Sequence, residues 1–87
     1  MKSGTCTIKT STVMELVDIT SRLTRDIEAN GTVDGICVIF NPHTTAGLTI
    51  NEGADPDVKS DIITGLKEIV PVNYPFKHAE GNSPAHI

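Results

Sequence analysis

The run Gly35–Phe40, which reads G-I-C-V-I-F, limits the possible folds of this chain more than any other segment. It has the length of a strand and is apolar without alternation, a pattern that predicts burial on both faces. The aromatic residues of the chain are one tyrosine and two phenylalanines, and there is no tryptophan. Because aromatic side chains dominate the buried area of most cores, either aliphatic residues form this core or part of it comes from outside the chain.

Strands are also predicted elsewhere, where β-branched residues are frequent. These segments are the threonine-rich stretch Thr5–Thr12, the stretch Val13–Ile19 and the weaker Ala46–Ile50.

Two helices are predicted from capping residues and apolar spacing. Thr20 or Ser21 is expected to cap the first helix, and Asn30-Gly31 to end it. The second has Asp55 as N-cap, Pro56 at its first position and Pro71 as its stop. Its apolar stripe is Val58, Ile62, Leu66 and Ile69. The sequence therefore predicts one α+β domain over residues 1–87, with an antiparallel or mixed β-sheet packed with two helices and loops from Val72 onward.

The net charge limits the classes of molecule that we expect this chain to bind. Eleven acidic residues against 7 basic ones give a net charge of −4 at pH 7, and the basic residues are scattered. We therefore expect no nucleic-acid partner. No apolar run is long enough to span a bilayer and the N-terminal segment is polar, so we expect no membrane association, no signal peptide and a cytoplasmic location. Cys6 and Cys37 are expected to be reduced.

The three histidines, His43, His78 and His86, all lie outside the predicted helices. Their spacing does not place two on one helical face, so each is either an ordinary polar residue or a member of a tertiary cluster. Gly81 and Pro84 are expected to force a tight turn between His78 and His86. This stretch is either that kind of cluster or a polar surface loop.

Other polar residues have a structural and a functional interpretation. The set His43-Thr44-Thr45-Ala46-Gly47 is either an oxyanion site or a threonine-rich strand edge. Glu52 is a metal ligand, a general base or an exposed turn carboxylate. Asp61, beside the apolar stripe, is a solvated residue or a partner that orients a histidine.

Three blocks in order carry a resemblance: N-P-H-T-T-A-G-L-T-I-N-E (Asn41–Glu52), D-P-D-V (Asp55–Val58) and H-A-E-G-N-S-P-A-H-I (His78–Ile87). The chain closely resembles the secondary thiamine-phosphate synthase family, also called YjbQ-like proteins. The resemblance implies a small cytoplasmic α+β protein, typically a homotrimer, that binds a small phosphorylated ligand.

The same resemblance implies roles for individual residues. It makes His43, His78 and His86 ligands of a divalent metal ion, with Zn²⁺ or another transition metal favoured over Mg²⁺ because imidazole suits those ions. It places Asn51, Glu52 and Asp61 at or near the catalytic pocket. Thr44, Thr45 and Asn82 are the candidates for holding phosphate oxygens.

The implied activity joins a hydroxymethylpyrimidine diphosphate to a thiazole phosphate and releases pyrophosphate, as a secondary activity. One alternative is a non-catalytic protein that binds metal or phosphate; another is a fragment without a competent site. Family members continue past the H-I at Ile87 with further strands and a G-T-W-Q-G motif, so the resemblance also implies that C-terminal strands are missing from this sheet.

Overall fold

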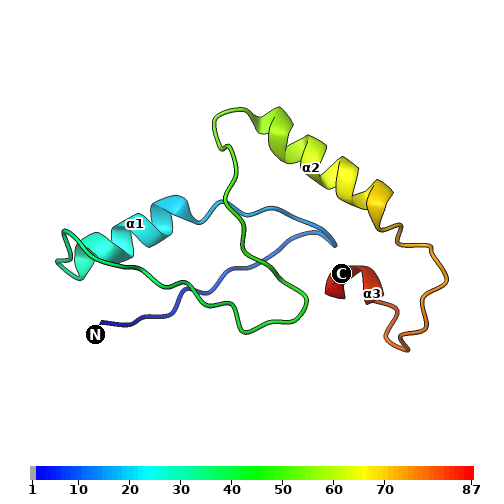
Figure 1. Cartoon of the computed structure of the whole chain (residues 1–87), viewed down its shortest axis with the longest axis horizontal. Helices are drawn as coiled ribbons and strands as arrows, with labels where there is room; N and C mark the ends of the chain where they lie inside the picture. The colour runs from blue at the N-terminus through cyan, green and yellow to red at the C-terminus, as the bar shows by residue number, and fades with distance from the viewer. Residues whose placement is uncertain (1) are drawn as a thin grey trace. The chain divides into compact units, whose positions relative to one another are not determined.

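The computed structural model describes residues 2–87 and contains three helices (Figure 1). They are α1 (Thr20–Ala29), α2 (Pro56–Ile69) and α3 (Ser83–His86). The chain separates into two compact units, Met1–Val38 and Ile39–Ile87, so that α1 belongs to the first and α2 and α3 to the second.

The predicted β-sheet is wrong, because residues 2–87 contain no strand. The runs expected to form it are extended segments without backbone pairing: across residues 32–54, for example, no backbone-to-backbone hydrogen bond is made. The side chains of Ile36, Val38 and Phe40, expected to be buried on both faces, are 95%, 84% and 81% exposed. Strand preference mostly reflects packing against neighbouring strands, and here no neighbour pairs with these runs.

Helix α1 forms where predicted, with one difference at its start. Thr20 is its first helical residue, and Ile19 is the N-cap. The Oδ1 atom of Asp18 accepts a hydrogen bond of 2.9 Å from the Thr20 N–H, which supplies one of the acceptors that a helix start lacks. At the other end Asn30 is the C-cap and Gly31 has a φ of 71°, a left-handed conformation that glycine adopts without strain.

Helix α2 confirms its predicted boundaries. The side chain of Asp55 accepts a hydrogen bond of 2.9 Å from the Asp57 N–H, and Pro56 occupies the first turn, where no intrahelical N–H is lost. The helix ends at Ile69, with Val70 as C-cap directly before Pro71. The predicted loop after Val72 differs in one respect, because Ser83–His86 forms the single turn of α3.

Little apolar surface is buried in either unit. No described residue is fully buried. On α2 the apolar stripe is half-buried at Val58 and Ile62, but Leu66 and Ile69 are 42% and 77% exposed. The stripe predicted from spacing therefore exists, and the C-terminal part of it has no cover.

Candidate functional site

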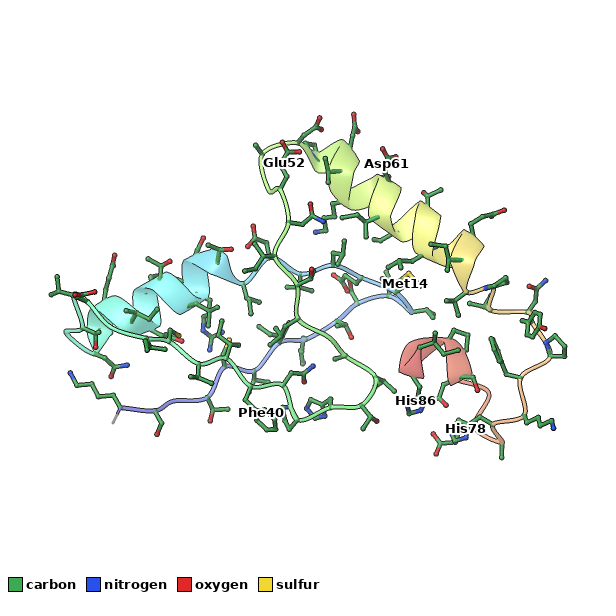
Figure 2. The ribbon with its side chains drawn as sticks, in the orientation of Figure 1. Met14, Phe40, Glu52, Asp61, His78 and His86 are labelled. Atoms are coloured by element: carbon green, nitrogen blue, oxygen red, sulfur yellow. The ribbon has the colours of Figure 1, made fainter. Side chains whose placement is uncertain are left out.

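The imidazole rings of His78 and His86 lie edge to face, with their centroids 5.3 Å apart and their planes at 87° (Figure 2). Both side chains are exposed. The two rings are in contact, and imidazole nitrogens bind metal ions when neutral and donate to anions when protonated. This pair is the centre of the candidate site.

A short turn brings these two rings together. The Gly81 N–H donates to the His78 carbonyl at 3.0 Å, and Gly81 has a φ of 74°, which favours glycine at this position. The chain then enters α3, where the Ala85 N–H donates to the Asn82 carbonyl at 3.0 Å. The turn expected from Gly81 and Pro84 is therefore present, and it carries His86 back to His78.

Asn82 lies between the two histidines in sequence and is half-buried. Its Oδ1 atom is buried and has no hydrogen-bond partner. A buried carbonyl oxygen without a partner costs about 1–3 kcal/mol, so a donor or a cation that reached it would be stabilising. Of the residues predicted to hold a ligand, Asn82 is the one whose side chain has a buried polar atom without a hydrogen-bond partner.

The loop that carries His43, Thr44 and Thr45 is organised by Asn41. The Asn41 side chain donates from Nδ2 to the Ala46 carbonyl at 2.7 Å, and its Oδ1 accepts from the His43 N–H at 3.1 Å. His43, Thr44 and Thr45 are exposed on this loop. Asn41 was not among the predicted site residues, although an asparagine two residues before His43 is a common signal of a side-chain-to-backbone turn.

The predicted carboxylates lie elsewhere in the second unit. The Glu52 N–H donates to Oδ1 of its neighbour Asn51 at 2.8 Å, in the segment before α2. Asp61 is exposed on α2. Figure 2 shows Glu52 and Asp61 at the N-terminal part of α2, whereas His78 and His86 lie together beyond its C-terminal end. The structure thus brings together two of the predicted site residues, His78 and His86, and leaves Glu52 and Asp61 apart from them.

The side chains on the turn from His78 to His86 supply some of the ligands that a metal site needs. Two imidazoles and an amide oxygen are a donor set that a divalent transition metal accepts. A catalytic zinc normally has three protein ligands and one open position. Across residues 2–87 the structure has no group of three histidine, cysteine, aspartate or glutamate side chains that could hold a metal, so His43 is not grouped there with the other two. The three-histidine metal site stays a prediction.

These observations define a class of protein: a small chain of short helices that carries an exposed, imidazole-bearing site on a tight turn. The part of the chain that the structure describes has no helix long and apolar enough to cross a membrane. Residues 4–87 match the family described as UPF0047 protein YjbQ-like, and the chain belongs to this family.

Individual proteins of the same family are similar to this chain in sequence. The chain is 56% identical over 80 residues to a UPF0047 protein of Methanocaldococcus jannaschii, an alignment that covers 92% of this chain and 58% of the relative. It is 43% identical over 84 residues to the UPF0047 protein YugU of Bacillus subtilis, covering 95% of this chain and 64% of that protein. The chain therefore spans about three fifths of the length of these relatives.

A solved structure is also similar. It is the crystal structure of an uncharacterised conserved protein of the YjbQ/UPF0047 family from Clostridium acetobutylicum, described as an orthologue of YugU. It superposes with a TM-score of 0.85 at 48% sequence identity, over 91% of this chain and 61% of that one.

Proposed function

We propose that this chain contributes the phosphate-binding residues of a thiamine-phosphate synthase-like transferase, with His78, His86 and Asn82 at the binding site. The observation that supports this proposal most directly is the edge-to-face contact of the two imidazoles at 5.3 Å on one tight turn. Membership of the YjbQ-like family agrees with it, and so does the sequence resemblance of the three motif blocks.

The proposed reaction is a substitution at a CH₂ carbon. The ring nitrogen of the thiazole phosphate supplies the electron pair of a new C–N bond to the exocyclic carbon of the pyrimidine. The C–O bond to the diphosphate breaks, and its electron pair leaves with pyrophosphate. Because negative charge accumulates on the leaving group, donors fixed beside the diphosphate lower the barrier.

The residues on the turn from His78 to His86 have distinct roles in this proposal. His78 and His86 donate ring N–H groups to phosphate oxygens. The Asn82 Nδ2 group donates to a phosphate oxygen and orients the ligand. In a second form of the site, the neutral imidazoles would instead hold a divalent transition metal, which would supply the positive charge to the diphosphate. Thr44, Thr45, His43, Asn51, Glu52 and Asp61 stay predicted site residues, and the homotrimer stays a predicted assembly.

The test is synthase turnover of the purified chain with the two phosphorylated substrates, with pyrophosphate release as the readout. We expect His78→Ala and His86→Ala each to reduce turnover by about tenfold or more, the loss that removal of one charge-stabilising donor typically causes. His78→Gln, which keeps a donor without the charge, should retain more turnover than His78→Ala. Lys77→Ala is the matched control, because Lys77 is an exposed cationic neighbour of His78. Unchanged turnover in both histidine variants would contradict the proposal.

A second function, binding of phosphate or metal without catalysis, is favoured by one observation. The carboxylates expected to act as bases, Glu52 and Asp61, lie away from the imidazole pair (Figure 2). This function predicts saturable binding of inorganic pyrophosphate, weakened by His78→Ala, in a chain that releases no pyrophosphate from the diphosphate substrate. Calorimetric titration beside the turnover assay separates the two functions.

A further inference from the structure

The first unit contains an asparagine–glycine dipeptide, Asn30-Gly31, at the C-terminal end of α1. Both residues are exposed. The backbone nitrogen that follows an asparagine can attack the asparagine side chain, and glycine hinders this attack least because it has no Cβ. Each of the other asparagines precedes either a proline, which has no N–H, or a residue with a side chain. They are Asn41, Asn51, Asn73 and Asn82.

The reaction that this dipeptide can undergo is deamidation through a cyclic succinimide. The Gly31 N–H gives up its proton to solvent, and the nitrogen forms a new C–N bond to the side-chain carbonyl carbon of Asn30. The bond from that carbon to Nδ2 breaks, and Nδ2 takes up a proton and leaves as ammonia. Water then opens the ring at one of its carbonyl carbons, which leaves aspartate or isoaspartate at this position. Water is the only other reactant.

A lysine from the start of the chain lies at the reacting peptide bond. The Lys2 Nζ atom donates a hydrogen bond to the Asn30 carbonyl oxygen, and it lies 3.9 Å from the position that a Cβ on Gly31 would take. Figure 1 shows the N-terminus at the same end of the first unit as the C-terminal end of α1. When Gly31 loses its proton, negative charge spreads onto the Asn30 oxygen, because both atoms belong to one conjugated peptide group. A cationic donor at this oxygen stabilises that anion.

Two hydrogen bonds hold the dipeptide before it reacts. The Asn30 Nδ2 group donates to the Asp26 carbonyl at 3.0 Å, and the Gly31 N–H donates to the Glu28 carbonyl at 2.9 Å. Both bonds lie at the end of α1, and helix ends open at a low cost in free energy. We propose that this dipeptide is a site of spontaneous deamidation in the folded chain, and that the Lys2 ammonium promotes the reaction. All of these residues belong to the first unit, so the proposal is independent of the proposed function.

Deamidation releases the end of α1. An aspartate in place of Asn30 has no side-chain N–H to donate to the Asp26 carbonyl. It also adds a negative charge beside the C-terminus of the helix, where the helix dipole favours cations. Isoaspartate in addition lengthens the backbone by a methylene group. The modified chain should therefore lose helical structure at the last turn of α1.

The test follows the purified chain during incubation at mildly alkaline pH, with mass spectrometry of its peptides as the readout. Each deamidation replaces NH₂ by OH and so changes the mass of the peptide that contains it. We expect modification at Asn30 before any other asparagine, and far slower modification in Asn30→Gln, because glutamine has to close a larger ring. Modification of another asparagine first, or an Asn30 amide that persists as long as the others, would overturn the proposal.

Variants of Lys2 separate the promoted reaction from the intrinsic reactivity of the dipeptide. Lys2→Ala should slow deamidation at Asn30 by about two- to fivefold, the scale of an exposed charge interaction, whereas Lys2→Arg keeps a cationic donor and should keep the rate. Lys9→Ala is the matched control, because Lys9 is an exposed lysine of the same unit. In urea all of these chains should react at one rate. Equal rates for the folded parent chain and Lys2→Ala, or equal slowing by Lys9→Ala, would contradict the role of Lys2.

Discussion

His78 and His86 are eight positions apart in sequence, and their rings meet edge to face at 5.3 Å because the chain turns at Gly81 and enters α3. The turn and the ring contact depend on each other. A substitution that opens the turn should therefore separate the rings without removing either histidine.

Gly81→Ala tests this dependence. The φ of 74° at Gly81 is strained for alanine, and a left-handed alanine costs about 1–2 kcal/mol. We expect the His78–His86 ring contact to weaken, with a loss of nuclear Overhauser effects between the two rings. Ala79→Gly in the same segment is the control, since it adds freedom without strain and should leave those effects largely in place. Unchanged ring contacts in Gly81→Ala would contradict this account of the turn.

Asn41→Ala should release the loop that carries His43, Thr44 and Thr45. The variant loses both the bond to the Ala46 carbonyl and the bond from the His43 N–H. A net loss of about 1 kcal/mol per hydrogen bond predicts up to about tenfold faster hydrogen exchange at the His43 amide. Asn73→Ala, at an exposed asparagine on the loop after α2, is the comparison and should leave the His43 amide unchanged.

Two glycine substitutions should change the stability of the protein in opposite directions. Gly65 lies inside α2, and a Cβ added there meets no atom within 4 Å, so Gly65→Ala should stabilise the helix by about 0.5–1 kcal/mol. Gly31 follows α1 with a φ of 71°, so Gly31→Ala should be destabilising. Helical circular dichroism should rise in the first variant and fall in the second. Changes of the same sign would show that one of these backbone conformations is misassigned.

Asp55→Ala should shorten α2 at its start. The Asp55 carboxylate accepts from the Asp57 N–H, and loss of such a cap costs about 1 kcal/mol. Hydrogen exchange should speed up at the amides of Asp57 and Val58 and change less toward Ile69. By contrast, Arg22→Ala should change the stability of α1 by less than about 0.5 kcal/mol, since the Arg22–Asp26 pair is exposed and 3.9 Å apart.

The helices were predictable because their signals are local. Asp55, Pro56 and Pro71 fix α2 through hydrogen bonds and ring geometry that involve only nearby residues. Gly31 does the same for the end of α1. Asp18 was missed as the acceptor for Thr20, although an aspartate two residues before a helix start is a readable signal.

The predicted sheet failed because its signal is not local. The valine and isoleucine content of Gly35–Phe40 indicates a side-chain surface that favours burial, but a strand also needs a partner for each backbone N–H and C=O. No such pairing occurs for residues 32–54, where Ile50, for example, is 99% exposed. Of the candidate site, the turn from His78 to His86 was predictable from Gly81 and Pro84. The bond of Asn41 from the His43 N–H was also readable from the sequence, whereas its bond to the Ala46 carbonyl depends on the path of the loop between them.

The two hydrogen bonds of Asn41 have a kinetic consequence for the loop that it holds. A loop already fixed by its own side chain does not have to search for its bound conformation, so less ordering entropy is lost when a ligand arrives. If a ligand binds at the predicted residues His43, Thr44 and Thr45, its association should follow a single step whose rate rises linearly with ligand concentration. Removing the Asn41 amide group would convert that association into a slower, two-step process without changing any of the residues predicted to bind the ligand.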